Sequence, residues 1–349
     1  MCTRVFNNIN FQYLTTARNM DWMFVLPTSL FVFEKGLKKI GISSTKPEER
    51  AKALKWQSSY RSVVAMVGDD CNGWASSDGM NEMGLVANAL YDTNASYEGP
   101  NSGCATNQLS VLRWVQYVLD NFVFVKDVVK AFSTGDIQLI GDKVPNSEDK
   151  SASIHLCVSD ATGNSAIIEV YKGRFDIHEN PKFKIVTNDP NYGAQLKLDD
   201  YWQWQWSTEN PHPSHTIPGG AYSADRFERA NFYISHVNNP ETESESIAQA
   251  RTVAANASVP IGYNFTDTKS PNISNTLWTT IATHKTLKYF FQNIRTPNIV
   301  WTDLSCFAFS SSSSKVDLIT LDDKSKATES PLQGNINDAF EPTRDPYKA

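Results

Sequence analysis

The chain contains no cluster of lysine or arginine and no long apolar run. Its 32 Lys and Arg residues are outnumbered by 38 Asp and Glu residues, which gives a net charge of −6 over 349 residues. This balance is not typical of a protein that binds nucleic acid. The longest apolar stretch, residues 24–33, is interrupted by Pro27 and is far shorter than the ~20 residues that span a bilayer. We therefore expect neither nucleic acid nor a membrane as a partner.

Cysteine is also scarce, and no two cysteines form a CxxC pair. An odd number of widely spread cysteines predicts neither a disulfide framework nor a zinc site. His212 and His215 have the spacing of a metal-binding pair, but they lie in a proline-rich segment with no third ligand nearby, so we interpret them as part of a loop. We expect no metal ion and no organic cofactor. The five cysteines are Cys2, Cys71, Cys104, Cys157 and Cys306.

Several common catalytic motifs are missing as well. The chain has no GxSxG, no GxGxxG and no complete phosphate-binding loop, which removes the usual signatures of serine hydrolases, dinucleotide-binding enzymes and nucleoside triphosphatases. A Cys–His–Asp triad stays open, because its members can be far apart in the sequence. Four histidines lie within strand or helix patterns, where we expect a structural role: His155, His178, His236 and His284.

The patterns that are present alternate between sheet and helix. Each helical pair needs a sheet to bury its apolar face. The order therefore predicts an α+β fold, a four-layer αββα sandwich in a single domain over residues 1–349. We predict strands or hairpins at 2–8, 12–18, 30–35, 60–67, 74–76, 85–91, 152–159, 166–177, 183–187, 277–284, 287–293 and 299–304, with a charged connection at 38–57 and a turn at 78–84. Helices are expected at about 106–121, 125–132, 223–236 (capped by Ser223) and 245–255, while 192–221 and 310–314 are expected to be irregular.

Cys2 is the candidate nucleophile. Removal of Met1 would leave one residue that carries both a thiol and a free α-amine. Such an amine titrates near pH ~8, so part of it is unprotonated at neutral pH and can take the thiol proton. No histidine is then required. Because only Met1 precedes Cys2, the sequence as given predicts a cytoplasmic protein, or a periplasmic one if Met1 replaces a removed export signal.

Arg18 and Asp21 follow at a spacing that suits a short hairpin. The returning strand would place a positive charge and a carboxylate beside Cys2. The arginine could stabilise the thiolate, and the carboxylate could orient the α-amine. The alternative is a solvated surface pair with no catalytic role.

Five motifs, in order, resemble the choloylglycine hydrolase family, which includes conjugated bile-salt hydrolases and penicillin V acylases. The resemblance covers the first two thirds of the chain and implies an N-terminal-nucleophile hydrolase fold. The motifs are Met1-Cys2-Thr3-Arg4, Arg18-Asn19-Met20-Asp21, Asp78-Gly79-Met80-Asn81-Glu82-Met83-Gly84-Leu85, Thr187-Asn188-Asp189-Pro190 and Ser223-Ala224-Asp225-Arg226-Phe227.

The resemblance implies a role for each matching position. Cys2 would attack an amide carbonyl, with Arg18 beside its thiol. Asp21 would hold the nucleophile and its amine. The side chain of Asn188 and the backbone N–H of Tyr91 would bind the oxyanion, and Arg226 would be a second active-site arginine. Without the resemblance, Asn188 is a turn residue and Arg226 a surface charge.

The resemblance also implies a substrate class. Tyr91 stands where penicillin V acylases carry tyrosine and bile-salt hydrolases usually carry asparagine, and Trp22 would line the acyl pocket. Both favour an aromatic acyl group and hence penicillin V. Conjugated bile salts and acyl-homoserine lactones remain alternative substrates, and a non-catalytic binder of an amphipathic ligand is the alternative from another class. A homo-oligomer is implied, a tetramer among the options, although residues 189–225 are shorter than in tetrameric Gram-positive members. The aromatic segment 201–206 would cover the cleft or form a subunit contact.

Overall fold

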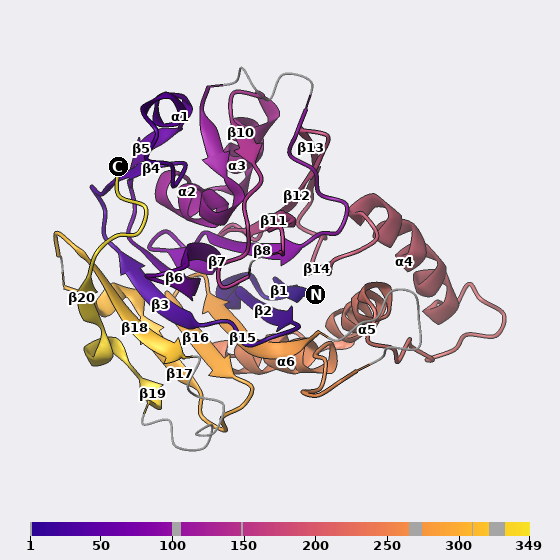
Figure 1. The fold of residues 1–349 in the computed structure, drawn as a ribbon. Coiled ribbons are helices and arrows are strands. Elements are labelled where there is room, and N and C mark those ends of the chain that lie inside the picture. Colours follow the sequence, from indigo (N-terminus) through magenta and orange to yellow (C-terminus); the bar gives the residue numbers. More distant parts are fainter. Residues whose placement is uncertain (1, 100–105, 148, 265–273, 309, 321–331) are drawn as a thin grey trace.

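Two large sheets form the centre of the molecule (Figure 1). The computed structural model describes residues 2–99, 106–147, 149–264, 274–308, 310–320 and 332–349. The seven-stranded sheet has the order β14 (Ile185–Val186), β1 (Cys2–Asn7), β2 (Thr15–Trp22), β15 (Asn275–Thr283), β16 (Lys288–Asn293), β17 (Val300–Asp303) and β19 (Gly334–Asn335). The nine-stranded sheet has the order β13 (Arg174–Glu179), β12 (Ser165–Tyr171), β11 (Ile154–Ser159), β8 (Val86–Tyr91), β7 (Gly73–Asn81), β6 (Ser62–Asp69), β3 (Thr28–Phe33), β18 (Ser313–Ile319) and β20 (Glu341–Thr343).

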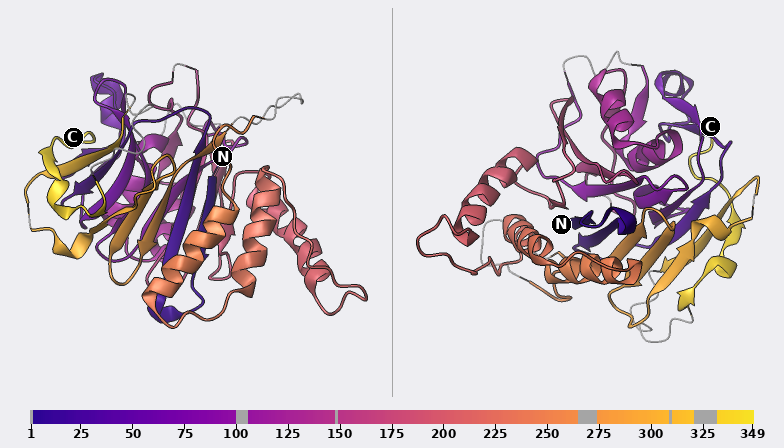
Figure 2. Two further views of the ribbon diagram at one scale, coloured as in Figure 1. Left: turned by 90° about the horizontal axis from the view of Figure 1, so that it is seen from below. Right: turned by 180° about the vertical axis from the view of Figure 1, so that it is seen from behind.

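Helices cover the outer face of each sheet. The helices α2 (Trp114–Asn121) and α3 (Val125–Ser133) pack on the nine-stranded sheet, and α5 (Ser223–His236) and α6 (Glu243–Asn256) pack on the seven-stranded sheet. The layers therefore follow the order helix, sheet, sheet, helix (Figures 1 and 2), which confirms the predicted αββα sandwich. None of the helices among the described residues combines the length and the apolar character needed to cross a bilayer.

The hydrophobic core has two main parts. One fills the space between the sheets and continues beneath α5 and α6, with Val5, Leu30 and Trp278 among its fully buried members. The other lies between the nine-stranded sheet and α2 and α3, around Trp114 and Phe132. Each large apolar side chain buried in this way contributes roughly 1.5–3 kcal/mol. Since β1 and β2 are buried along their whole length, any polar side chain in them must find a partner inside the protein.

The segment after residue 191 corrects one prediction. Residues 192–206 were expected to be irregular but form the helix α4 (Tyr192–Trp206), which begins where the side chain of Asn191 accepts a hydrogen bond from the backbone of Ala194. Only Tyr192 and Gln195 of this helix are fully buried. It stands out from the body of the molecule beside α5 (Figure 2). A helix buried only in its first turn shows no apolar periodicity, so the pattern missed it.

Other predicted boundaries also shift. The turn expected at 78–84 is too long, because Asp78 is still paired with Asn88 in β7 and β8. The helix expected from 106 begins at Trp114, after a strand and a 3-10 turn, and the loop expected at 310–314 ends where Ser313 enters β18. The connection at 38–57 contains regular structure. The remaining elements are β4 (Lys38–Ile40), α1 (Pro47–Lys52), β5 (Lys55–Gln57), β9 (Gln108–Ser110) and β10 (Gln138–Ile140), with 3-10 turns at Phe11–Tyr13, Val111–Arg113, Leu304–Cys306 and Asn337–Ala339.

Candidate active site

The opening hairpin presents two different faces. Cys2 lies opposite Met20 in the antiparallel pair β1 and β2, and side chains alternate along each strand. Cys2 and Met20 accordingly point into the space between the sheets, where both line a cavity. Thr3 and Asp21 point the other way, toward Arg226 of α5. The inner face of the hairpin therefore carries the candidate nucleophile, and the outer face carries the polar side chains that contact α5.

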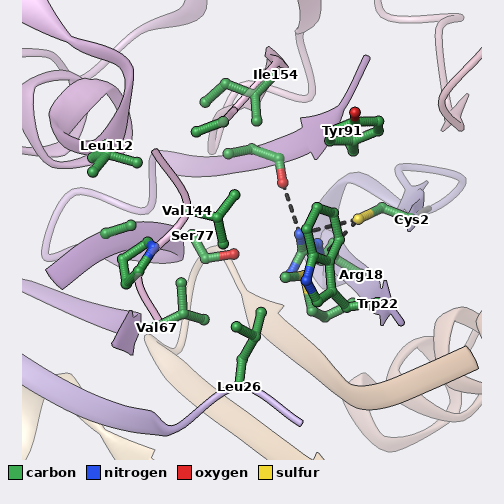
Figure 3. Close-up of a pocket in the computed structure, with 15 residues that line it drawn as sticks. Cys2, Arg18, Trp22, Leu26, Val67, Ser77, Tyr91, Leu112, Val144 and Ile154 are labelled. Carbon is green, nitrogen blue, oxygen red and sulfur yellow. Dashed lines mark hydrogen bonds between the residues drawn. The ribbon is translucent and has the colours of Figure 1, made fainter. Parts of the chain in front are cut away.

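Arg18 contacts the sulfur of Cys2 directly. Its Nη2 atom donates to Cys2 Sγ at 3.3 Å and to the carbonyl oxygen of Ala89 at 2.7 Å (Figure 3). The guanidinium also stacks on the ring of Trp278, 4.8 Å from the centroid. Cys2 and Arg18 are both almost fully buried. A guanidinium held this close could pair with a thiolate on Cys2.

Asn188 and Arg226 contact the main chain of Cys2. The Cys2 nitrogen donates to Asn188 Oδ1 at 2.6 Å. In the chain described here this nitrogen belongs to the Met1–Cys2 peptide, and it stands in for the α-amine that removal of Met1 would free. Arg226 donates to the Cys2 carbonyl oxygen at 2.7 Å, to Thr3 Oγ1 at 2.6 Å and to Asn188 Oδ1 at 2.8 Å. The two side chains thus fix the position of Cys2 from the side of α5.

Asp21 completes this buried group. Its carboxylate lies 3.5 Å from Arg226 Nη1 and accepts a hydrogen bond from Thr276 at 2.7 Å. Burial lowers the pKa of Arg226, and the Asp21 carboxylate opposes that shift. Because Cys2 pairs with Met20, the same register continued by one residue puts Asp21 just beyond the Cys2 end of β1.

Tyr91, at the end of β8, turns its backbone toward the same point. Asp92 donates its N–H to Ser153, and Tyr91 is the next residue along the same ladder, opposite Ile154. In an antiparallel pair such residues alternate, so the N–H and C=O of Tyr91 point away from β11. The Tyr91 carbonyl accepts a hydrogen bond from Asn188 Nδ2 at 2.6 Å. Its N–H lies on the same edge of the strand as this carbonyl.

Three contributions to the site were missed from the sequence. Ser223 was expected to cap α5, but the cap is Tyr222. The Ser223 hydroxyl instead accepts the backbone N–H groups of Asn188 and Asp189, at 2.8 Å each, and so positions the Asn188 loop. Thr276 and the carbonyl of Ala89 were not identified either. Ser223 belongs to a motif quoted above, but the sequence indicated only a cap role for it. Thr276 and Ala89 stand in separate strands without a local motif, so nothing in the sequence marked them.

A mainly apolar cavity opens beside the Cys2 sulfur (Figure 3). Its empty volume, open mouth included, is about 530 Å³. Trp22 and Tyr91 stand at the Cys2 end with their rings in an edge-to-face contact, 5.4 Å between centroids. Burial raises the pKa of the Tyr91 phenol, which therefore stays protonated. The lining residues are Cys2, Arg18, Met20, Trp22, Leu26, Val67, Ala75, Ser77, Ala89, Tyr91, Leu112, Val144, Pro145, Ala152 and Ile154.

Histidine and acidic side chains gather at two further places. Asp92, His155 and Glu169 bring ligand-type atoms within 4.8 Å of one another, as do Glu169, Asp176 and His178. These are the groups among the described residues whose side chains could hold a metal ion. The ring of His155 lies 3.9 and 4.0 Å from the two carboxylates of the first group, beyond hydrogen-bond length. His155 is 1% exposed, a buried position of the structural kind that was expected for it.

The remaining histidines and cysteines fit the sequence analysis better. His284 is hydrogen-bonded to Thr16 and to the carbonyl of Gly84, and burial lowers its pKa to about 4. His212 and His215 lie in a loop, as predicted. Cys71 and Cys306 are free and exposed, while Cys2 and Cys157 are free and buried; Cys104 lies outside the described residues.

The fold and this site together define a hydrolase of the N-terminal-nucleophile architecture. The model of one family, described as linear amide C–N hydrolases of the choloylglycine hydrolase family, matches residues 2–317. This protein belongs to that family.

Two relatives and two solved structures are similar to this chain. A penicillin V acylase of Pectobacterium atrosepticum is 37% identical over 325 residues, which are 88% of this chain and 82% of that protein. A bile salt hydrolase/transferase of Clostridium perfringens is 27% identical over 179 residues, half of each chain. The penicillin V acylase structure from Agrobacterium tumefaciens superimposes with a TM-score of 0.81 at 33% identity over 99% of both chains. A mutant conjugated bile acid hydrolase from Clostridium perfringens, at 18% identity, shares the fold with a TM-score of 0.72 over 92% of this chain and 97% of its own.

Proposed function

We propose that this protein hydrolyses penicillin V to 6-aminopenicillanic acid and phenoxyacetate through an acyl-enzyme formed on Cys2. The observation that carries the proposal is the position of the Cys2 sulfur. It lies 3.3 Å from Arg18 Nη2, at the wall of an apolar cavity, while the nitrogen of the same residue is held by Asn188. A binding protein would need the cavity but not this arrangement around the thiol, which argues against the non-catalytic alternative.

The first step would be activation of the thiol within Cys2 itself. After removal of Met1, the unprotonated α-amine takes the thiol proton, and Arg18 stabilises the resulting thiolate. Asn188 Oδ1 accepts a hydrogen bond from the same nitrogen, and the Asp21 carboxylate lies just beyond it along the hairpin register. Both groups favour the ammonium form that results.

Acylation would follow by attack of the thiolate on the amide carbonyl carbon. The oxyanion that forms would accept hydrogen bonds from the Tyr91 backbone N–H and from Asn188 Nδ2. Asn188 Nδ2 carries two hydrogens. One of them is donated to the Tyr91 carbonyl, and the other would be donated to the oxyanion. When the C–N bond breaks, the α-ammonium gives its proton to the leaving nitrogen. The products of this step are a thioester on Cys2 and the free amine.

Deacylation would use the same groups in reverse. The α-amine, neutral again, takes a proton from a water molecule, whose oxygen attacks the thioester carbonyl. The same two donors hold the second oxyanion. When that intermediate collapses, the C–S bond breaks, the carboxylic acid leaves, and the α-ammonium gives its proton to the sulfur, which restores the thiol and the neutral α-amine. No cofactor enters any of these steps.

The cavity supports an aromatic acyl group. The edge-to-face pair of Trp22 and Tyr91 offers flat ring surfaces at the Cys2 end, and aromatic rings gain about 0.5–1.5 kcal/mol from such contacts beyond area burial. The penicillin V acylase at 37% identity supports the same substrate. Conjugated bile salts and long-chain acyl-homoserine lactones are the alternatives, since both are amides with an apolar acyl group that an apolar cavity could accept.

The test is a comparison of initial rates on penicillin V, glycine-conjugated bile salt and a long-chain acyl-homoserine lactone. The protein must first be shown by intact mass to lack Met1, because the peptide nitrogen of an unprocessed chain cannot act as the base. We expect the highest kcat/KM on penicillin V. A preference for bile salt would contradict the substrate and leave the mechanism standing, and no turnover of any substrate would contradict both.

We also propose a homo-oligomer in which α4 forms a subunit contact. Leu198, Tyr201 and Trp204 are exposed on this projecting helix, and aromatic residues are enriched at protein interfaces. Light scattering of the wild type and of Tyr201→Lys/Trp204→Lys tests this proposal. A wild-type monomer would contradict it.

A further inference from the structure

An irregularity in β7 shapes one wall of the cavity. Along the pair β6 and β7, Met66 lies opposite Ser76 and Ala65 lies opposite Asp78, so Ser77 has no partner residue on β6. One extra residue in one strand is a β-bulge, and bulges near active sites commonly redirect a side chain.

The contacts of the neighbouring residues show what the bulge does. Ser76 points outward and donates to the Leu112 carbonyl at 2.8 Å, beneath the helical layer. Asp78 points inward, where it accepts hydrogen bonds from Tyr289 of the opposite sheet and from Asn88. Ser77 also points inward, since it lines the cavity. In a regular strand Ser77 and Asp78 would lie on opposite faces, but the bulge places both on the inner side.

The hydroxyl of Ser77 stands out in this environment. Its neighbours on the cavity wall include Leu26, Val67 and Ala75 (Figure 3). Ser77 is 5% exposed, yet the structure contains no hydrogen bond from its hydroxyl to any described residue. A hydroxyl that faces a cavity without a protein partner can donate a hydrogen bond to an acceptor on a bound ligand.

Trp22 lines the same cavity and carries a second donor, its indole N–H. The indole nitrogen of Trp22 is buried and has no acceptor among the described residues, although the residue is 5% exposed. Donors of this kind in an otherwise apolar pocket recognise an oxygen on the ligand and fix its orientation.

We infer that Ser77 and Trp22 form a polar subsite that selects amides whose acyl group carries an oxygen acceptor. This inference rests on the proposed function, because the acyl group must enter the cavity when the thiolate of Cys2 attacks its carbonyl. The ether oxygen of an aryloxyacetyl group and the keto oxygen of a 3-oxoacyl chain both have the required chemistry. An acyl group made only of carbon leaves both donors buried and unpaired, and the site discriminates against it.

The experiment uses substrate pairs that differ in one atom or group. Penicillin V is compared with the 3-phenylpropanoyl derivative of 6-aminopenicillanic acid, in which CH₂ replaces the ether oxygen. A 3-oxoacyl-homoserine lactone and its unsubstituted counterpart form the second pair and separate ether from ketone recognition. For each pair the ratio of kcat/KM values is measured on the wild type, Ser77→Ala, Ser77→Thr and Trp22→Phe.

The expected wild-type ratio for the penicillin pair is roughly 3- to 10-fold in favour of the ether, the size of one or two neutral hydrogen bonds. Ser77→Ala and Trp22→Phe each reduce the ratio toward one, and Ser77→Thr, which keeps the hydroxyl, preserves it. Val67→Ala is the matched control. It enlarges the same cavity without removing a donor, so it affects both members of a pair alike and leaves their ratio of kcat/KM values unchanged.

The possible failures are distinguishable. A ratio that is unchanged in both Ser77→Ala and Trp22→Phe overturns the subsite while the proposed hydrolysis stands. A wild type that hydrolyses both members of the penicillin pair equally well also overturns it. A wild type that hydrolyses no substrate of either pair overturns the proposed function and this inference together.

Discussion

Cys2 has a polar side and an apolar side, and they are built in different ways. On the polar side, Asp21, Asn188 and Arg226 are fully buried and joined by hydrogen bonds or an ion pair. On the apolar side, the cavity wall is made of Leu26, Val67 and other side chains that offer contact but few polar groups. The polar side can position Cys2 and stabilise charge beside it. The apolar side can only select which acyl group binds in the cavity. The comparison suggests that chemistry and selectivity can change separately in this fold.

Replacement of the nucleophile gives the largest expected effect. Cys2→Ala removes the sulfur that both sides surround, so turnover of every substrate should fall below detection. The polar contacts use the main chain of Cys2, and the unfolding free energy should therefore change by no more than about 2 kcal/mol. Initial rates and a thermal melt measure the two effects. Cys71→Ser, which alters an exposed thiol, is the control and should keep full activity; turnover by Cys2→Ala would contradict the mechanism.

A pair of variants tests the separation of the two sides. Asn188→Ala removes a proposed oxyanion donor and should lower kcat by ~10²–10³ on all substrates. Val67→Ala should change KM more than kcat, by less than about tenfold, and differently for each class of substrate.

Asn188→Asp refines this test, because it keeps the acceptor for the Cys2 nitrogen and loses the N–H donor. Its kcat should fall as far as that of Asn188→Ala. If Asn188→Asp retains wild-type kcat, the role of Asn188 is to position Cys2 and not to bind the oxyanion.

The smallest expected effect concerns a buried carboxyl group that has no basic partner. Arg226 of α5 faces Asp21, but Glu228, two residues along the helix, lies against Asp199 of α4. Burial, with Asp199 adding to it, raises the pKa of Glu228 from 4.5 to about 9. The unfolded chain loses this proton near 4.5, so between about pH 4.5 and 9 the folded state holds a proton that the unfolded state does not. Stability should therefore fall as the pH rises through this window.

Glu228→Gln makes this position neutral at every pH and can still donate a hydrogen bond to Asp199. We expect the same Tm as the wild type at pH 5 and a Tm about 2–5 °C higher at pH 8.5. Differential scanning calorimetry at the two pH values measures the difference. A difference in Tm that does not depend on pH would show that Glu228 is already ionised in the folded protein.

The polar side was accessible from the sequence because its residues lie in compact motifs. Cys2, Arg18 and Asp21 belong to one hairpin, and Asn188 and Arg226 stand in short segments with a distinctive composition. The structure brings all five together and adds the end of β8 with Tyr91. Their catalytic roles remain predictions. The αββα order was also predictable, since paired helices without a sheet could not bury their apolar faces.

Apart from Trp22 and Tyr91, the apolar side was not accessible in this way. Its wall combines residues from β2, β6, β7, β8 and the segments near Leu112 and Val144, and only the stacking of two sheets makes them neighbours. Ser77 depends on a bulge, and the run Ser76-Ser77-Asp78 contains no sign of where one residue slips out of register. The helix α4 was not predicted for a related reason. Most of it is not buried against the rest of the protein, so its sequence carries no apolar stripe.

The position of β1 between two neighbouring strands also bears on the order in which the active site is assembled during synthesis. Cys2 is 2% exposed, and its partners Asn188 and Arg226 lie 186 and 224 residues further along the chain. A chain made from its N-terminus at roughly 5–20 residues per second has its first residues outside the ribosome long before those partners exist. In that interval the peptide bond before Cys2 is accessible to a protease, and the thiol does not yet have the contacts that Arg18 and Asn188 make with Cys2 in the folded chain. A thiol and an α-amine freed then would gain these contacts only when folding is complete.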